Sequence, residues 1–200
     1  MSNIISVRKI LQALYYIQSN APADNEAKNN IMYLLKILFF ADRYHLRNYG
    51  CLATDDIYYA MKNGPVASAT FDILRNNLPK NANIYEHMLL EDVEVIDEYS
   101  VHINLQGDDE LSDSFKEALD FALENYGNYD HFNLSDISHD YPEWKKYENR
   151  LKNGEKRCEI KRDDFFDNPK QLDKSKKLGI KKDPYLVNIE LTEALKQDLD

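Results

Sequence analysis

Residues 31–50 constrain the fold more than any other part of the chain. They read IMYLLKILFFADRYHLRNYG, so an almost wholly apolar segment runs into a polar cluster. A helix that is apolar nearly all round has to be covered on most of its sides. The sequence therefore predicts a central helix over about residues 25–47 that ends at Tyr49 and Gly50, where glycine suits a left-handed stop.

The other elements follow from capping residues and from the spacing of apolar side chains. Helical spacing predicts helices over about residues 6–18, 68–76, 112–125, 133–139, 142–147 and 186–199. Residues 54–61, 93–96 and 99–105 have strand patterns, and the last two form a hairpin. We expect a mainly α fold with a small β hairpin or sheet (α+β), a compact helical domain around the central helix.

Length and composition fit one domain with an appended segment. We assign residues 1–150 to the domain and residues 151–200 to a Lys-rich extension with a C-terminal helix, packed on the same domain. The longest apolar run is too short to cross a bilayer, and the N-terminus lacks the pattern of a secretion signal. Cys51 and Cys158 have no partners at metal-ligand spacing. We therefore expect a cytoplasmic protein with reduced cysteines and no membrane association.

Charge is distributed unevenly along the chain. The net charge is −10, and between Lys80 and Lys116 there are ten Asp or Glu and no Lys or Arg. Such an acidic body disfavours binding to nucleic acid. Two interpretations of the acidic stretch stay open: a solvated face, or a surface that meets a basic partner through residues such as Glu91, Asp92 and Glu94.

Asp42 and His45 continue the apolar stripe of the central helix and lie one turn apart, so they are close enough to touch. One interpretation is a histidine base oriented by an aspartate. However, no nucleophile motif accompanies the two residues. We favour a buried polar lock, formed against the backbone of a corner at Asn63, Gly64 and Pro65. The sequence thus predicts no catalytic residues.

A second set of side chains falls on a different face of the same helix. It comprises Lys36, Phe40, Arg43 and Arg47. This face is either a solvated basic surface or a docking surface, in which an exposed aromatic ring is flanked by cations.

Metal, cofactor and DNA sites find little support. His131 and His139 stand near three aspartates, but only His139 has an acidic neighbour at usable helical spacing. The chain contains no nucleotide-binding glycine motif. Residues 112–139 have the proportions of a helix-turn-helix, yet the second helix carries no Lys or Arg to read DNA. We expect no metal and no cofactor.

Three sequence blocks nevertheless occur in a characteristic order. The first is KILFFADRYHL at residues 36–46, followed by Tyr49 and Gly50; the second is YYAMKNGPV at residues 58–66. The third is LSDISH at residues 134–139, with Trp144 after it. Together they resemble the Panacea (SocA-like) antitoxin domain of bacterial and phage toxin–antitoxin systems. The chain departs from this pattern just after Gly50 and at Asp55.

The resemblance implies an antitoxin that neutralises a co-encoded toxin by direct protein contact, without chemistry of its own. It also implies a structural set of residues, namely Asp42, His45, Asn63, Gly64, Pro65, His139 and Trp144. The resemblance also implies that the toxin is, in some pairs, one that acts on RNA or nucleotides. Such a toxin presents a basic site, which the acidic stretch is suited to cover. Two alternatives remain: a DNA-binding regulator of its own operon, and an adaptor that presents a partner to a protease.

Overall fold

The computed structural model describes residues 6–78, 84–180 and 184, and its central element is α2 (Ile31–Tyr49). The Asn30 side chain caps α2 by accepting hydrogen bonds from the Met32 and Tyr33 amides. Gly50 ends it with a φ of 78°. The predicted start at residue 25 was wrong, because Asn30 is extended and separates α2 from a short 3-10 helix, η1 (Glu26–Asn29).

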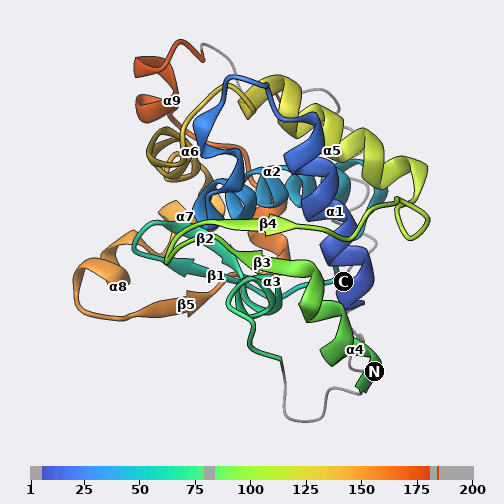
Figure 1. Cartoon of the computed structure of the whole chain (residues 1–200). Helices are drawn as coiled ribbons and strands as arrows, with labels where there is room; N and C mark the ends of the chain where they lie inside the picture. Colours follow the sequence, from blue (N-terminus) through green and yellow to red (C-terminus); the bar gives the residue numbers. More distant parts are fainter. Residues whose placement is uncertain (1–5, 79–83, 181–183, 185–200) are drawn as a thin grey trace.

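Among the helices that pack on α2 are the longer helices α1 (Val7–Asn20), α5 (Asp113–Tyr126) and α6 (His131–Ser138) (Figure 1). Ser6 caps α1 and Ser112 caps α5, each by accepting a backbone N–H three residues on. These elements confirm the helices predicted from capping residues and apolar spacing. A helix apolar on most sides requires such covering, and α2 receives it.

Shorter helices complete the described chain. They are α3 (Ser68–Leu74), α4 (Ile84–Leu89), η2 (Leu90–Asp92), α7 (Pro142–Lys145), α8 (Glu148–Lys152), η3 (Arg162–Phe166) and α9 (Asp173–Lys177). The helix predicted over residues 186–199 lies outside the described residues.

Two small antiparallel sheets accompany the helices. In the first, β1 (Tyr58–Met61) lies between β2 (Gly64–Ala67) and β5 (Arg157–Glu159). In the second, β3 (Val93–Val95) pairs with β4 (Val101–Ile103), which confirms the predicted hairpin. The mainly α, α+β fold class predicted from the sequence is therefore confirmed.

The first sheet differs from the sequence prediction in two details. The strand predicted over residues 54–61 begins at Tyr58, because Thr54 is bonded to Asp42 and the Asp56 carboxylate accepts the Thr70 amide of α3. The predicted corner at Gly64 and its neighbours is itself strand β2, and the chain turns at residues 62–63 instead.

The described part of the Lys-rich extension contacts the main body. Strand β5 adds to the edge of β1, with Cys158 opposite Ala60. Phe165 and Phe166 of η3 are buried in the same core, and Phe165 meets the rings of Phe39 and Tyr58. Within the described ranges, no helix is both long and apolar enough to span a membrane.

Candidate functional site

Asp42 lies at the centre of a buried polar lock. Its carboxylate accepts hydrogen bonds from the Thr54 amide (3.1 Å), the Thr54 hydroxyl and the Tyr58 hydroxyl (2.8 Å). Burial raises the pKa of Asp42 to about 6, and these hydrogen bonds oppose the rise by stabilising the charged form. The loop after α2 is thereby tied to the middle of the helix.

His45 has a different set of partners. Its Nδ1 lies 2.7 Å from the Cys51 carbonyl oxygen and its Nε2 lies 3.0 Å from the Ser114 hydroxyl of α5. Burial lowers the pKa of His45. Asp42 therefore bonds to groups other than His45, and the expectation that the two touch was wrong. The two side chains are bonded to separate groups, so they do not form a catalytic acid–base pair with each other.

The predicted contact with the hairpin corner is made by Lys36 instead. Its Nζ donates to the Pro65 carbonyl oxygen at 2.7 Å, and the side chain is 1% exposed. Burial lowers the pKa of Lys36 to about 7. A side chain added at Gly64, which has a φ of 100°, would overlap the Ser138 hydroxyl and the Lys36 side chain. The glycine thus permits close approach of β2 to α2 and α6.

The four residues predicted to form a separate exposed face are all buried. Phe40 stacks on Tyr126 with ring centroids 3.9 Å apart. Arg43 forms an ion pair with Glu143 and also donates to the Asp167 carbonyl oxygen. This burial corrects the docking surface expected from Lys36, Phe40, Arg43 and Arg47. The physical reason is that α7 and η3, from late in the chain, cover Arg43 and Arg47, while α5 covers Phe40 and β2 covers Lys36.

Arg47 also binds η3 and the residues that follow it to α2. Its guanidinium donates to the carbonyl oxygens of Phe165 (3.0 Å) and Asp167 (3.2 Å) and to the Asn168 side chain (2.6 Å). Residues 165–168 are thus bound to α2 by a fork of charge-assisted hydrogen bonds. The arginines of the first sequence block hold the extension on the body.

The second and third blocks meet at the β1–β2 hairpin. Trp144 donates its indole N–H to the Met61 carbonyl oxygen at 2.7 Å, and the Ser135 hydroxyl donates to the Asn63 carbonyl oxygen at 2.9 Å. His139 stacks on Trp144 with centroids 3.7 Å apart. Burial lowers the pKa of His139 to about 4. Segments that are far apart in the sequence are joined here.

The aspartates near His131 and His139 have separate structural tasks. Asp130 accepts the Asn133 amide and so caps α6, while Asp140 accepts the amides of Lys174 and Ser175 and holds α9. Asp136 pairs with Lys174. Among the residues that the structure describes, no group of three or more His, Cys, Asp or Glu could hold a metal ion.

The acidic stretch divides into two parts. Asp108 and Asp109 pair with Lys116 and Arg8, so their charge is offset by neighbouring helices. Glu91 and Glu94, by contrast, are exposed on η2 and β3, and Asp92 is half-buried between them. The three acids named as partner contacts therefore lie near the surface, and their binding role stays a prediction.

Beyond these buried contacts, a groove opens between the two sheets. This apolar groove has a cavity volume of about 820 Å³. Its floor is the start of α2 with Met32 and Leu35, and its rims carry Phe71 of α3, Tyr99 of the β3–β4 turn and Phe132 of α6. Charged side chains of both signs lie around its edge, among them Arg75 and Glu98.

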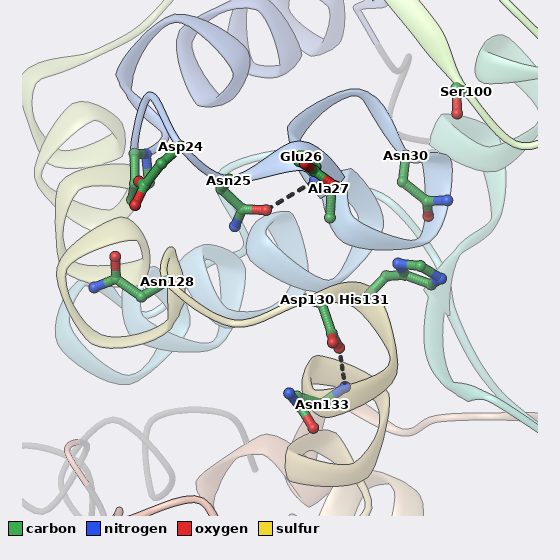
Figure 2. Close-up of a pocket in the computed structure, with 11 residues that line it drawn as sticks. Asp24, Asn25, Glu26, Ala27, Asn30, Ser100, Asn128, Asp130, His131 and Asn133 are labelled. Atoms are coloured by element: carbon green, nitrogen blue, oxygen red, sulfur yellow. Dashed lines mark hydrogen bonds between the residues drawn. The ribbon is translucent and has the colours of Figure 1, made fainter.

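A second cavity of about 600 Å³, here called the polar hollow, lies around η1 and the start of α6 (Figure 2). The carboxylates of Asp24, Glu26 and Asp130 line it together with several asparagines. Asn25 fixes one wall, because its side-chain N–H₂ donates to the carbonyl oxygens of Gly127 and Tyr129. The wall at Asn25 is therefore held in place by hydrogen bonds to the backbone that precedes α6.

The aromatic residues at the rims of the groove were not predicted from the sequence. Tyr99 is 59% exposed and Phe132 is 67% exposed. A usable signal existed in the local pattern: each is a large ring at the start of an element or in a turn, where its neighbours are polar. Their convergence on one groove depended on tertiary contacts.

Comparison with known proteins gives a clear family. The family model described as "Antitoxin SocA-like, Panacea domain" matches residues 34–145, which is more than half of the chain. No curated protein and no solved structure matches the chain. The matched range contains all three sequence blocks and both ends of the Arg43–Glu143 ion pair. The chain belongs to the SocA-like Panacea antitoxin domain family.

Proposed function

We propose that this protein neutralises a cognate toxin by direct, stoichiometric protein–protein binding. The observation that carries the proposal is the family match over residues 34–145. The buried polar groups of the matched blocks are consistent with it, since Asp42 and His45 are bonded to structural partners. Binding alone accounts for the function, without a reaction catalysed by this chain.

Electrostatics support a basic partner. The net charge of −10 attracts a basic surface over distances of several ångströms and accelerates the encounter. Glu91 and Glu94 are exposed and near each other in the chain. A toxin that acts on RNA or nucleotides requires cations in its active site, so an acidic antitoxin suits that class of toxin.

The Lys-rich extension gives weaker support to regulation through DNA. Several of its lysines are paired with acids of the same chain: Lys152 with Glu148, Lys161 with Glu159, and Lys174 with Asp136. Paired lysines on a folded body attract phosphate less than free ones. Toxin binding is therefore the better supported function.

Co-expression with the adjacent gene tests the proposal. We expect this chain to restore growth of cells that express the neighbouring gene product, and the two purified proteins to co-elute at a fixed ratio. Rescue by a strongly substoichiometric amount of this chain, without a complex, would indicate an enzyme and overturn the proposal.

A further inference from the structure

The apolar groove and the polar hollow are two parts of one cleft. Asn30, Ser100 and His131 line both cavities, so the cavities adjoin along these three residues. In the view of Figure 2, Asp24 and Asn128 lie toward one end of the hollow, while Ser100 lies at the other end, toward the groove. A ligand that follows the cleft passes from an apolar into an acidic environment.

The apolar half has features of a protein-binding surface. Phe132 and Tyr99 expose most of their rings at its rim, where water has to be displaced to cover them. Exposed large apolar side chains gathered around a groove typically mark interaction sites. Aromatic residues also provide most of the binding energy at many interfaces.

The polar half has one sign of charge. Asp24, Glu26 and Asp130 are exposed carboxylates at its wall, and no Lys or Arg lies among the described residues that line it. A cationic side chain placed in the hollow would meet three acids and no like charge.

The junction between the two halves contains a buried nitrogen atom without a hydrogen bond. The Nδ1 atom of His131 is inaccessible to solvent and has no hydrogen-bond partner among the described residues. Buried polar atoms usually have a partner. Because this atom is closed off from solvent, a ligand would reach it only after the His131 ring turned toward the cleft, so the site rests on the exposed rings of the groove and the acids of the hollow.

We propose that this cleft is the toxin-binding site, and that the toxin inserts a segment with a large apolar side chain next to a Lys or Arg. The apolar side chain occupies the groove between Tyr99 and Phe132, and the cation lies in the polar hollow beside Asp24 and Glu26. This inference rests on the proposed function and adds the surface and the partner chemistry to it.

The test measures binding of the purified product of the adjacent gene to groove variants. Phe132→Ala and Tyr99→Ala should each weaken the affinity by roughly 10- to 100-fold, as loss of an aromatic anchor does. The matched controls Ile57→Ala and Met88→Ala remove equally exposed apolar side chains outside the cleft. They should leave the affinity unchanged. Thermal melting of all four variants should match the parent protein, because these side chains are mostly exposed.

Charge reversal tests the polar half separately. Asp24→Lys combined with Glu26→Lys should slow association by roughly tenfold or more. The control Asp113→Lys with Glu124→Lys makes the same change in net charge on the exposed face of α5. An equal effect of both pairs would show that only the overall charge matters and would overturn the assignment of the cation to the hollow.

Cross-linking identifies the occupant. Benzoylphenylalanine at position 132 should capture a toxin peptide that contains a large apolar residue within a few positions of Lys or Arg, while the same probe at position 57 should capture none. If the groove variants bind the toxin as well as the parent protein does, the assignment of the cleft as the binding site is overturned and the proposed function stays intact. Absence of binding by the parent protein would overturn both. Capture of this chain's own peptides at position 132, with a dimer in sedimentation that Phe132→Ala abolishes, would replace the toxin by a second copy.

Discussion

Arg43 and Glu143 form an ion pair inside the protein, with the guanidinium Nε 2.5 Å from a carboxylate oxygen and neither side chain exposed. The pair joins α2 to α7 across a hundred residues of sequence. The Arg43 guanidinium also lies over the Tyr141 ring at 4.6 Å. The first sequence block is thus joined by charge in the core to the residue that precedes Trp144.

We expect Arg43→Met or Glu143→Met alone to lower the free energy of unfolding by roughly 3–5 kcal/mol, because each leaves an uncompensated buried charge. The double variant should recover much of that loss, since it removes both charges. Urea unfolding of the three variants measures this coupling. Arg150→Met, which removes an exposed ion pair with Glu155, is the control and should leave stability nearly unchanged. Additive losses in the double variant would show that the pair is not coupled.

Asp42 and His139 should give the protein opposing pH dependences. The folded-state pKa of Asp42 is raised to about 6, so between about pH 4 and 6 the folded state binds more protons and the Asp42 contribution to stability falls as pH rises. The folded-state pKa of His139 is lowered to about 4 by burial and by Lys36, so its contribution rises between about pH 4 and 6.5.

Single variants separate the two contributions. Relative to the parent protein, Asp42→Asn should gain about 3 kcal/mol of unfolding free energy between pH 4 and 6. His139→Phe, which keeps a ring against Trp144, should lose a similar amount, about 3 kcal/mol, between pH 4 and 6.5. Urea titrations across this pH range test both. Slopes identical to that of the parent would mean that neither group titrates abnormally.

Lys36 should make the free energy of unfolding depend on pH in a third, higher pH range. Its pKa is about 7 in the folded state and has the ordinary value of 10.5 in the unfolded state. Between these limits the unfolded state binds more protons, so stability should rise with pH. Lys36→Met should lose this rise while Lys62→Met, which removes an exposed lysine of the hairpin turn, should keep it. Unfolding free energies at about pH 7 and pH 9.5 distinguish the two, below the range in which tyrosines ionise.

The exposed acids of η2 and β3 should affect the rate of toxin binding. Replacing Glu91, Asp92 and Glu94 by Gln, Asn and Gln should lower the association rate constant, and the difference should shrink as salt rises beyond about 0.15 M. Stopped-flow mixing with the toxin measures the rate. The matched control on α5, Asp113→Asn with Asp120→Asn and Glu124→Gln, removes the same charge elsewhere. A parent rate constant that is independent of salt would show that the acidic stretch only solubilises the protein.

Local sequence determined the longer helices and the family, but not the short helices α4, α8, η3 and α9. The caps at Ser6, Ser112 and Gly50 and the apolar spacing around them fixed where helices begin and end, because capping and amphipathic spacing act within a few residues. The three sequence blocks were sufficient to indicate the Panacea domain, and the family model confirms it over residues 34–145.

Only the tertiary structure decided which sides of α2 are covered. Helical geometry separates Arg43 and Arg47 from the apolar stripe, but it contains no information about Glu143, Phe165 or Asp167, which reach them from a hundred residues or more away. Likewise, Tyr99 and Phe132 share a groove because a hairpin turn and a helix start meet over α2. Such contacts depend on the packing of distant segments, and a pattern read along one stretch of chain cannot specify them.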